Sequence, residues 1–288
     1  MITYLIVQSL LNGIVLGTLY LMMAIGFTLV FGVMRIVNFA HGEFYMLGAF
    51  FALIGVTWLG LPFWATLALI VVVSILLGAV VERVVFRPFR QDELSGMIAS
   101  LGLAMILQNG ALLLFGPDPQ AMPSLASGVY HLGQFIVPKS RAVTLGIAAV
   151  ILIGFYFFLM HSRTGRALRA LVQDQEIAAL YGVRLELMYP LGLGLGVGLA
   201  GVAGGLMAPL FGVSPFIGAT PLLKAFIVVI LGGLGSIPGA ALAALLLGVI
   251  ESFANSFISA SAADIISFGL VVAVLLWRPS GLLGRGEL

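Results

Sequence analysis

The stretch MITYLIVQSLLNGIVLGTLYLMMAIGFTLVFGV, residues 1–33, decides the fold, because it contains no charged side chain. A helix needs about 20 predominantly apolar residues to cross the hydrocarbon core of a bilayer, and this run is longer. A cleavable signal peptide would place basic residues before a shorter apolar run. We therefore expect residues 1–33 to be retained as a membrane helix.

The rest of the chain has the same character, with 61% hydrophobic and 8% charged residues over 288 positions. Soluble domains carry about 25% charged residues, and a membrane β-barrel would show alternating segments of about ten residues. The sequence predicts an all-α, polytopic transmembrane bundle of about eight membrane segments, in the range seven to nine. The apolar blocks are 5–33, 43–60, 62–84, 95–115, 142–160, 188–211, 222–234, 238–257 and 262–277.

Basic residues predict the orientation, since cytoplasmic loops are enriched in Lys and Arg. The loop 161–187 holds four arginines and is placed in the cytoplasm, which puts the Pro- and Gly-rich loop 116–141 outside. Arg278 and Arg285 favour a cytoplasmic C-terminus, which requires an even number of crossings after residue 187. Because block 222–234 is short for a crossing, the exact number of crossings stays open.

A first interruption is MRIVNFAHGEFYMLGAF, residues 34–50. Asn38 is predicted to cap a helix that starts at Phe39, and Glu43 suits the positive end of that helix. Capping leaves Arg35 and His41 unexplained, and ionisable groups inside a membrane are candidates for function. The spacing of His41 and Glu43 does not match a helical zinc motif, so we expect no metal site.

A second interruption, LGGLGSIPGA at residues 231–240, breaks another apolar helix pattern. Its helix-breaking residues are Gly232, Gly233, Gly235, Ser236, Pro238 and Gly239. A turn at the interface is one interpretation. The other is a transport pathway, because paired broken helices in two halves of a chain are typical of transporters. The halves would be 1–115 and 142–288 of a single domain, although no clear residue-by-residue repeat relates them.

The cytoplasmic loop predicts an amphipathic helix that begins at Thr164 or Gly165 and ends at Gly182. One polar stripe follows from the spacing of Arg166, Arg169, Gln173 and Glu176. Such a helix can rest on anionic headgroups or dock a cytoplasmic protein, and its length and mixed charge favour docking.

Other features received simpler interpretations. The glycines of LGLGLGVGLAGVAGGLMAPL (191–210) are expected to let helices pack closely. Lys224, Glu251 and Asp264 lie near the ends of membrane segments and are expected to snorkel to the interface. The chain has no Cys, and no P-loop, Gly-x-Ser-x-Gly or His-Glu-x-x-His motif, so thiol, ATPase and hydrolase chemistry have no support.

Three motifs together resemble one family. VNFAHGEFYMLGAF (37–50), GRALRALVQDQEIAALYGV (165–183) and LLKAFIVVILGGLGSIPGAALAALLLGVIES (222–252), followed by WRPSGLLG (277–284), resemble segments of the inner-membrane permeases of bacterial branched-chain amino acid ABC importers. The resemblance covers nearly the whole chain.

This resemblance implies a multi-pass permease in the bacterial inner membrane, without an ATPase site or cofactor of its own. The implied partners are a second homologous permease, two cytoplasmic ABC ATPases that bind ATP and a periplasmic binding protein. Membrane lipid surrounds the chain, and no nucleic acid is expected. The implied substrates are leucine, isoleucine and valine. Urea or short amides are an alternative substrate class, and an ion-coupled secondary transporter is an alternative mechanism. No nucleophile–base or metal-binding pattern in the sequence supports an intramembrane enzyme.

The resemblance also implies site residues. Those at the ATPase interface would be Gly165, Arg166, Arg169, Gln173, Asp174, Glu176 and Gly182. Those on the translocation path, at the two interruptions, would be Asn38, His41, Gly42, Glu43, Gly232, Gly233, Gly235, Ser236, Pro238 and Gly239. The Glu176–Gly182 spacing matches the Glu-to-Gly spacing of the common importer motif, although Ile177 interrupts its alanines.

Overall fold

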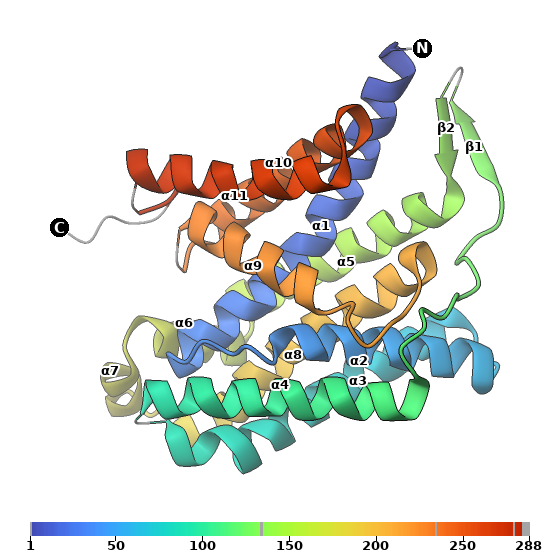
Figure 1. The fold of residues 1–288 in the computed structure, drawn as a ribbon. Coiled ribbons are helices and arrows are strands. Elements are labelled where there is room, and N and C mark those ends of the chain that lie inside the picture. Colours follow the sequence, from blue (N-terminus) through green and yellow to red (C-terminus); the bar gives the residue numbers. More distant parts are fainter. Residues whose placement is uncertain (1, 91, 133–134, 234, 279, 284–288) are drawn as a thin grey trace. The chain divides into compact units, whose positions relative to one another are not determined.

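The computed structural model describes residues 2–90, 92–132, 135–233, 235–278 and 280–283. Within these ranges the fold is almost entirely helical (Figure 1). The helices are α1 (Ile2–Met34), α2 (His41–Leu53), α3 (Phe63–Val81), α4 (Glu93–Phe115), α5 (Lys139–His161), α6 (Arg163–Gln173), α7 (Gln175–Leu180), α8 (Leu185–Phe211), α9 (Ala219–Gly232), α10 (Ile237–Phe257) and α11 (Ala260–Trp277). Single π-helical turns, Ile54–Trp58 and Glu82–Phe86, extend α2 and α3. An antiparallel hairpin, β1 (Val129–Leu132) and β2 (Phe135–Pro138), precedes α5.

The predicted helical membrane bundle is confirmed, since every predicted apolar block lies on a helix. Among the described residues, seven helices are long and apolar enough to cross a membrane. The block at 222–234 corresponds to α9, which has 14 residues and is shorter than these seven. A helix of this length spans only about 21 Å, which is less than a hydrocarbon core of about 30 Å.

The chain divides into two compact units, and each unit is made of segments that alternate along the sequence with those of the other. The first unit comprises Met1–Ile25, Ser124–Ala149 and Leu223–Leu288, and the second comprises Gly26–Pro123 and Val150–Leu222. These units do not coincide with the halves 1–115 and 142–288, and an internal repeat between those halves stays a prediction.

The second unit is built around α8, which lies beside α2 and α3 (Figure 1). Of the 18 most apolar consecutive residues of α8, 83% are buried. In the corresponding stretch of α4 only 11% are buried. The glycines of α8 allow this burial: a methyl group at Gly204 would overlap the backbone carbonyl of Tyr45, and one at Gly194 would lie 2.7 Å from the carbonyl of Ile75. The expected packing role of the glycines at 191–210 is confirmed.

In the first unit, the N-terminal part of α1 packs against α10 through small residues on both helices. A methyl group at Gly13 would lie 2.6 Å from the Cα atom of Val249, and one at Gly17 would lie 2.8 Å from the carbonyl oxygen of Ala244. Helix α10 also packs along α11, the helix that follows it in the chain. Close backbone approach of this kind is how membrane helices gain dispersion energy without a hydrophobic driving force.

Candidate functional site

The first interruption separates α1 from α2 in a short non-helical segment. Helix α1 ends at Met34, and Arg35 takes the left-handed conformation with φ 57° while its N–H donates to the Phe31 carbonyl over 2.8 Å. Helix α2 begins at His41, so the predicted start at Phe39 was wrong. Asn38 therefore does not cap a helix that begins there: its Oδ1 accepts from the Ala40 N–H at 3.0 Å and so shapes the turn before α2.

The polar residues of this interruption are enclosed by protein. Asn38 and His41 are buried, and Glu43 is 7% exposed in the first turn of α2, at the helix end where an acidic group is favoured. The His41 ring makes an edge contact with Phe27, with ring centroids 5.7 Å apart. A methyl group at Gly42 would lie 2.6 Å from the carbonyl oxygen of Gly218, where the chain enters α9. Asn38 and Gly42 shape the backbone here, and the part of all four residues in a translocation path stays a prediction.

The second interruption is a turn between α9 and α10, so the predicted break is confirmed. Gly233 and Gly235 have φ values of 97° and 81°, which residues with a Cβ rarely adopt. Ser236 caps α10 by accepting from the Gly239 N–H at 3.1 Å. A methyl group at Gly239 would overlap the carbonyl of Gly232, so the two helix ends lie in close contact.

The chain's C-terminal residues complete this turn. Carbonyls in the last turn of a helix have no partner within the helix. Here the Leu282 N–H donates to the carbonyl of Leu231 at 2.8 Å, and the Leu283 N–H donates to that of Gly232 at 3.2 Å. The segment beginning at Trp277 thus returns to close the end of α9. Because the two interruptions belong to different compact units, their facing one path stays a prediction.

The loop 161–187 forms two helices where one was predicted. Helix α6 begins after Ser162, whose Oγ accepts from the Gly165 N–H at 2.8 Å, so the predicted start at Thr164 or Gly165 was wrong. Asp174 is extended (φ −155°, ψ 118°) and caps α7 by accepting from the Ile177 N–H at 2.9 Å. The predicted end near Gly182 is confirmed, because this residue has φ 84° and closes the turn after α7.

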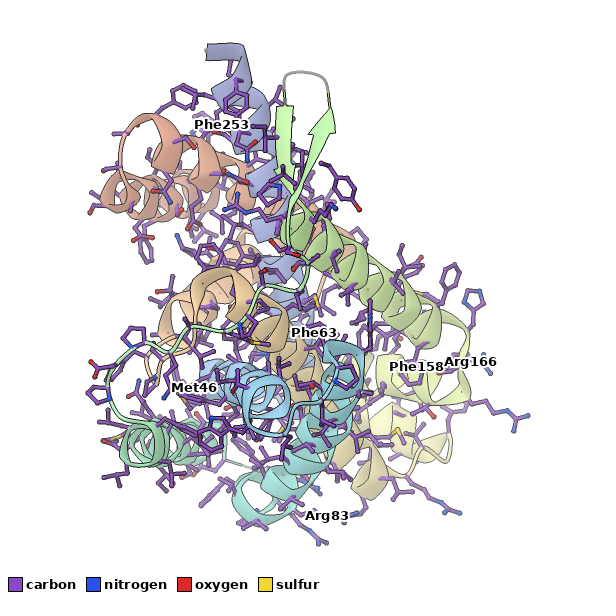
Figure 2. The ribbon with its side chains drawn as sticks, turned by 90° about the vertical axis from the view of Figure 1, so that its right-hand side faces the viewer. Met46, Phe63, Arg83, Phe158, Arg166 and Phe253 are labelled. Carbon is purple, nitrogen blue, oxygen red and sulfur yellow. The ribbon has the colours of Figure 1, made fainter. Side chains whose placement is uncertain are left out.

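The residues predicted at a docking surface differ in exposure. Gly165 is buried, and a methyl group there would lie 2.6 Å from the Cα atom of Leu159 on α5. Arg169 is half-buried and donates to the Met160 carbonyl at 3.2 Å. Arg166 extends outward from α6 (Figure 2). The other exposed members of the predicted set are Gln173, Asp174, Glu176 and Gly182.

Sequence reasoning missed an exposed apolar group on α7. Ile177, Leu180 and Tyr181 are 52%, 86% and 87% exposed. Their spacing of three and four residues places them on one face of the helix and was the signal available in the sequence. We call Glu176, Ile177, Leu180 and Tyr181 the α7 surface. Large apolar side chains next to polar ones on a loop segment are typical of a protein-binding surface.

An ionic cluster at the end of α3 was also missed. The Arg90 Nε donates to Oε1 of the fully buried Glu82 at 2.8 Å, and its guanidinium lies 4.2 Å from the centre of the Tyr189 ring. Arg90 also pairs with Glu186 at 3.4 Å, and Arg87 pairs with Glu186 at 3.1 Å. The cluster joins the end of α3 to the start of α8.

The expected snorkelling was wrong for Lys224 and Glu251, which are 2% and 12% exposed, whereas the Asp264 side chain is 57% exposed. Lys224 is 2% exposed and pairs with Glu251 at 3.1 Å and with Asp264 at 2.9 Å. Its Nζ also donates to Ser267 Oγ at 3.2 Å, while Tyr20 Oη donates to Glu251 at 3.1 Å. One buried ammonium thus ties α9 to α10 and α11. Its carboxylate partners take the place of the water that a snorkelling ammonium would reach.

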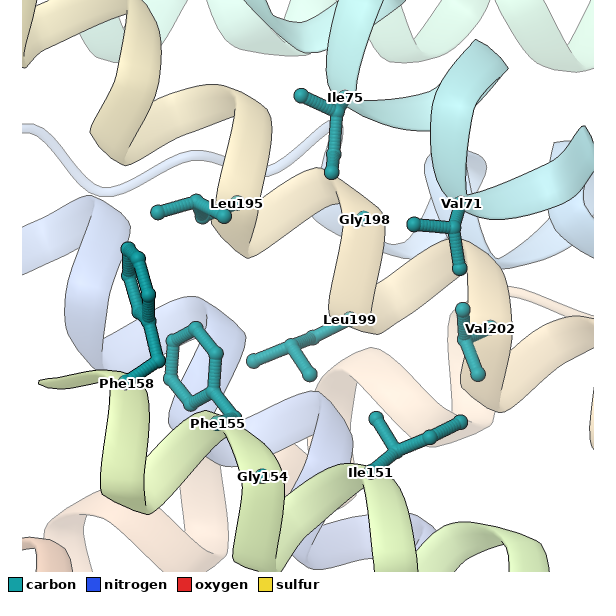
Figure 3. A pocket seen from close by; sticks show the side chains of 10 residues that line it. All are labelled: Val71, Ile75, Ile151, Gly154, Phe155, Phe158, Leu195, Gly198, Leu199 and Val202. Atoms are coloured by element: carbon teal, nitrogen blue, oxygen red, sulfur yellow. The ribbon is translucent and has the colours of Figure 1, made fainter. Parts of the chain in front are cut away.

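A cavity of about 230 Å³ lies in the second unit among α3, α5 and α8 (Figure 3). Phe155 and Phe158 of α5 face Leu195 and Leu199 of α8 across it, and Ile75 of α3 closes one side. Its lining residues are all apolar or glycine, so it offers no partner to an ammonium or carboxylate group. None of the residues of the two interruptions lines it.

Comparison with known proteins gives a consistent result over nearly the full length. Residues 9–275 match the family described as the branched-chain amino acid transport system permease component. The chain is 36% identical to the high-affinity branched-chain amino acid transport system permease protein BraD of Pseudomonas aeruginosa, over 97% of this chain and 96% of BraD. It is 35% identical to LivH of Escherichia coli K12, with the same coverage. A more distant similarity, 28% identity over 93% of this chain and 68% of the relative, relates it to LivM of the same organism. No solved structure matches significantly.

Proposed function

Because the chain belongs to the branched-chain amino acid transport permease family, we propose that it is a membrane-spanning subunit of an ABC importer for leucine, isoleucine and valine. The observation that carries this proposal is the 35–36% identity to BraD and LivH over 97% of the chain. The subunit forms the translocation path and has no ATPase site of its own. ATP is bound by partner subunits.

The similarity to both LivH and LivM supports a pair of homologous permeases. A binding protein outside the membrane delivers the substrate, and two cytoplasmic ATPases drive the change of access. The arginines of α6 and of the loop around it favour a cytoplasmic position for α6 and α7, which is the side where ATPases would bind. The bilayer is then the bacterial inner membrane.

The α7 surface is the proposed contact with an ATPase. Leu180 and Tyr181 are almost fully exposed there, and burial of such side chains against a partner would supply most of the binding energy. Glu176 and Asp174 add negative charge beside them, which favours a partner surface with basic residues. Large apolar side chains that lie together on an exposed face often mark a protein-binding site, which supports this assignment.

The experiment is reconstitution of the permease pair with both ATPases in liposomes, with the binding protein outside. We expect ATP-dependent uptake of radiolabelled leucine and not of urea. Uptake of leucine without ATP would support a secondary transporter instead. ATP-dependent uptake of urea but not of leucine would show that the substrates are urea or short amides and not branched-chain amino acids.

Two variants test the docking surface in the same preparation. Leu180→Asp is expected to abolish co-purification of the ATPases, and Glu176→Arg to reduce leucine uptake. Leu94→Asp is the matched control, since Leu94 is exposed in the first turn of α4, where an acidic side chain is tolerated. Unchanged uptake by Glu176→Arg and Leu180→Asp would remove the assignment of α7 to ATPase docking.

A further inference from the structure

Gln175, the first residue of α7, uses both ends of its side-chain amide to join two other helices. Its Nε2 donates to the carbonyl oxygen of Val33 at 3.1 Å. Its Oε1 accepts from the hydroxyl of Tyr189 at 2.8 Å. The side chain therefore connects the docking segment to the end of α1 and to the start of α8.

The contact with Val33 occurs at the point where α1 stops. Helix α1 ends at Met34, so the Val33 carbonyl lies in the last turn and has no partner within the helix. Arg35 adds a second link, since its Nη2 donates to the Val172 carbonyl of α6 at 3.4 Å. The same helices are in van der Waals contact, because a methyl group at Gly32 would lie 2.9 Å from the Val172 side chain.

The contact with Tyr189 continues into the helices of the second unit. Tyr189 is buried, and its ring lies against the Arg90 guanidinium, which pairs with the buried Glu82 at the end of α3. From Tyr189 onward, α8 packs along α2 and α3 with its glycines in backbone contact. A displacement of Tyr189 would therefore move α8 against helices whose backbones it already touches at its glycines.

Gln175 also lies next to the break between α6 and α7. Asp174 is extended there, so α7 can change direction relative to α6 with few dihedral changes. Since the apolar part of the α7 surface follows Gln175 by two to six residues, any motion imposed on that surface acts on Gln175 first. Its amide is uncharged, so both hydrogen bonds can be broken and remade without leaving a buried charge.

We propose that Gln175 is the positioning residue that transmits movement of α7 to the end of α1 and, through Tyr189, to α8. This inference rests on the proposed function, because it assumes that an ATPase moves the α7 surface. It predicts a defect in coupling between ATP hydrolysis and transport, and not in assembly.

Two variants separate the links. Gln175→Glu keeps an acceptor for Tyr189 but removes the donor to the Val33 carbonyl. Tyr189→Phe removes the hydroxyl but keeps the ring over Arg90. Arg163→Gln is the control: it lowers the net charge by one, as Gln175→Glu does, and Arg163 is exposed on α6 with no side-chain partner in the described part of the chain.

The measurement is leucine taken up per ATP hydrolysed by the reconstituted complex, with co-purification of the ATPases and the melting temperature recorded alongside. We expect Gln175→Glu and Tyr189→Phe to assemble and hydrolyse ATP, with the ratio lowered about fivefold, the factor expected for one lost hydrogen bond. The double variant should lower the ratio further than either single variant, because one substitution cuts the link to α1 and the other cuts the link to α8. Arg163→Gln should keep the wild-type ratio.

An unchanged ratio in both single variants would overturn the inference. So would loss of ATPase binding in Gln175→Glu at an unchanged melting temperature, since that result would place the side chain in the docking surface itself. Failure of the proposed function would appear elsewhere, as a wild-type complex that takes up no leucine when ATP is supplied.

Discussion

Replacing Lys224 by methionine removes the only cation from the buried ionic cluster of the first unit, as far as the described residues show. Methionine has nearly the same length, so packing changes little while the charge is lost. Glu251 and Asp264 then remain as two carboxylates that had shared one ammonium at 3.1 and 2.9 Å. Tyr20 and Ser267 are hydroxyl groups and offer no compensating charge.

The cost follows from the exposure of the two carboxylates. Breaking a buried ion pair by removing one partner costs about 3–5 kcal/mol, because the other charge is left uncompensated. The Glu251 side chain is 12% exposed and carries most of this cost, whereas Asp264 is 57% exposed and contributes little after solvent screening. We expect a loss of about 3 kcal/mol, which lowers the melting temperature by roughly 6–12 °C for a chain of this size.

The assay is thermal unfolding of the purified chain in detergent, followed by loss of the monodisperse peak in size-exclusion chromatography. Lys139→Met is the matched control: Lys139 lies 5.4 Å from the Tyr130 ring, a contact worth less than about 1 kcal/mol. A variant that also carries Glu251→Gln and Asp264→Asn should regain most of the lost stability, because no buried charge is left. If Lys224→Met melts with the wild type, or the triple variant is the least stable, the reasoning fails.

Three further predictions concern the second unit. Gly204→Ala should abolish the monodisperse peak in gel filtration, because the added methyl group would overlap a backbone carbonyl of α2. The control Gly102→Ala on α4 has open space around its methyl group and should elute as the wild type does. Arg90→Ala should lower the free energy of unfolding by about 3–5 kcal/mol, because it leaves the fully buried Glu82 carboxylate without its cation. Arg87→Ala breaks an exposed ion pair and should lower it by less than about 1 kcal/mol. Hydrogen bonds from Ser95 lower the pKa of Asp92 below its usual 3.8. The stabilisation by this N-cap is therefore complete above that value and is lost as pH falls through the lower folded-state pKa, so the difference in melting temperature between wild type and Asp92→Asn should disappear in acid.

The positions of the membrane helices could be predicted from sequence because the bilayer imposes a length and a composition on each one. The blocks at 95–115 and 238–257 differ from α4 and α10 by at most two residues at either end. The glycine-rich block at 191–210 was also interpreted correctly, because small residues in membrane helices mainly serve close packing.

The division of the segment 161–187 into α6 and α7 could not be predicted from its periodicity. Arg166, Arg169, Gln173 and Glu176 keep helical spacing across the break, so the pattern continues where the backbone does not. Only Asp174 marks the boundary, by accepting from a backbone N–H three residues later. Aspartate also occurs within helices, and the sequence alone gave no reason to prefer the cap.

Tertiary pairing explains the failed interpretation of Lys224. Its partners are 27 and 40 positions away in sequence, on α10 and α11. A single ionisable residue near the end of a membrane segment is reasonably expected to reach for water. What decides between snorkelling and pairing is whether a carboxylate from another helix lies within reach, and this depends on how the helices pack.

Arg35 shows how the first interruption is connected to the rest of the second unit. Capping could not explain this residue from sequence, yet its left-handed backbone ends α1 and its guanidinium reaches the Val172 carbonyl on α6. Three residues later, Asn38 shapes the turn into α2, and its side chain is buried. The stretch 34–50 thus has its start bound to α6 and its end buried against α8. A segment held in this way is suited to pass a displacement into the membrane helices, and Arg35 and Asn38 are the polar residues that shape it.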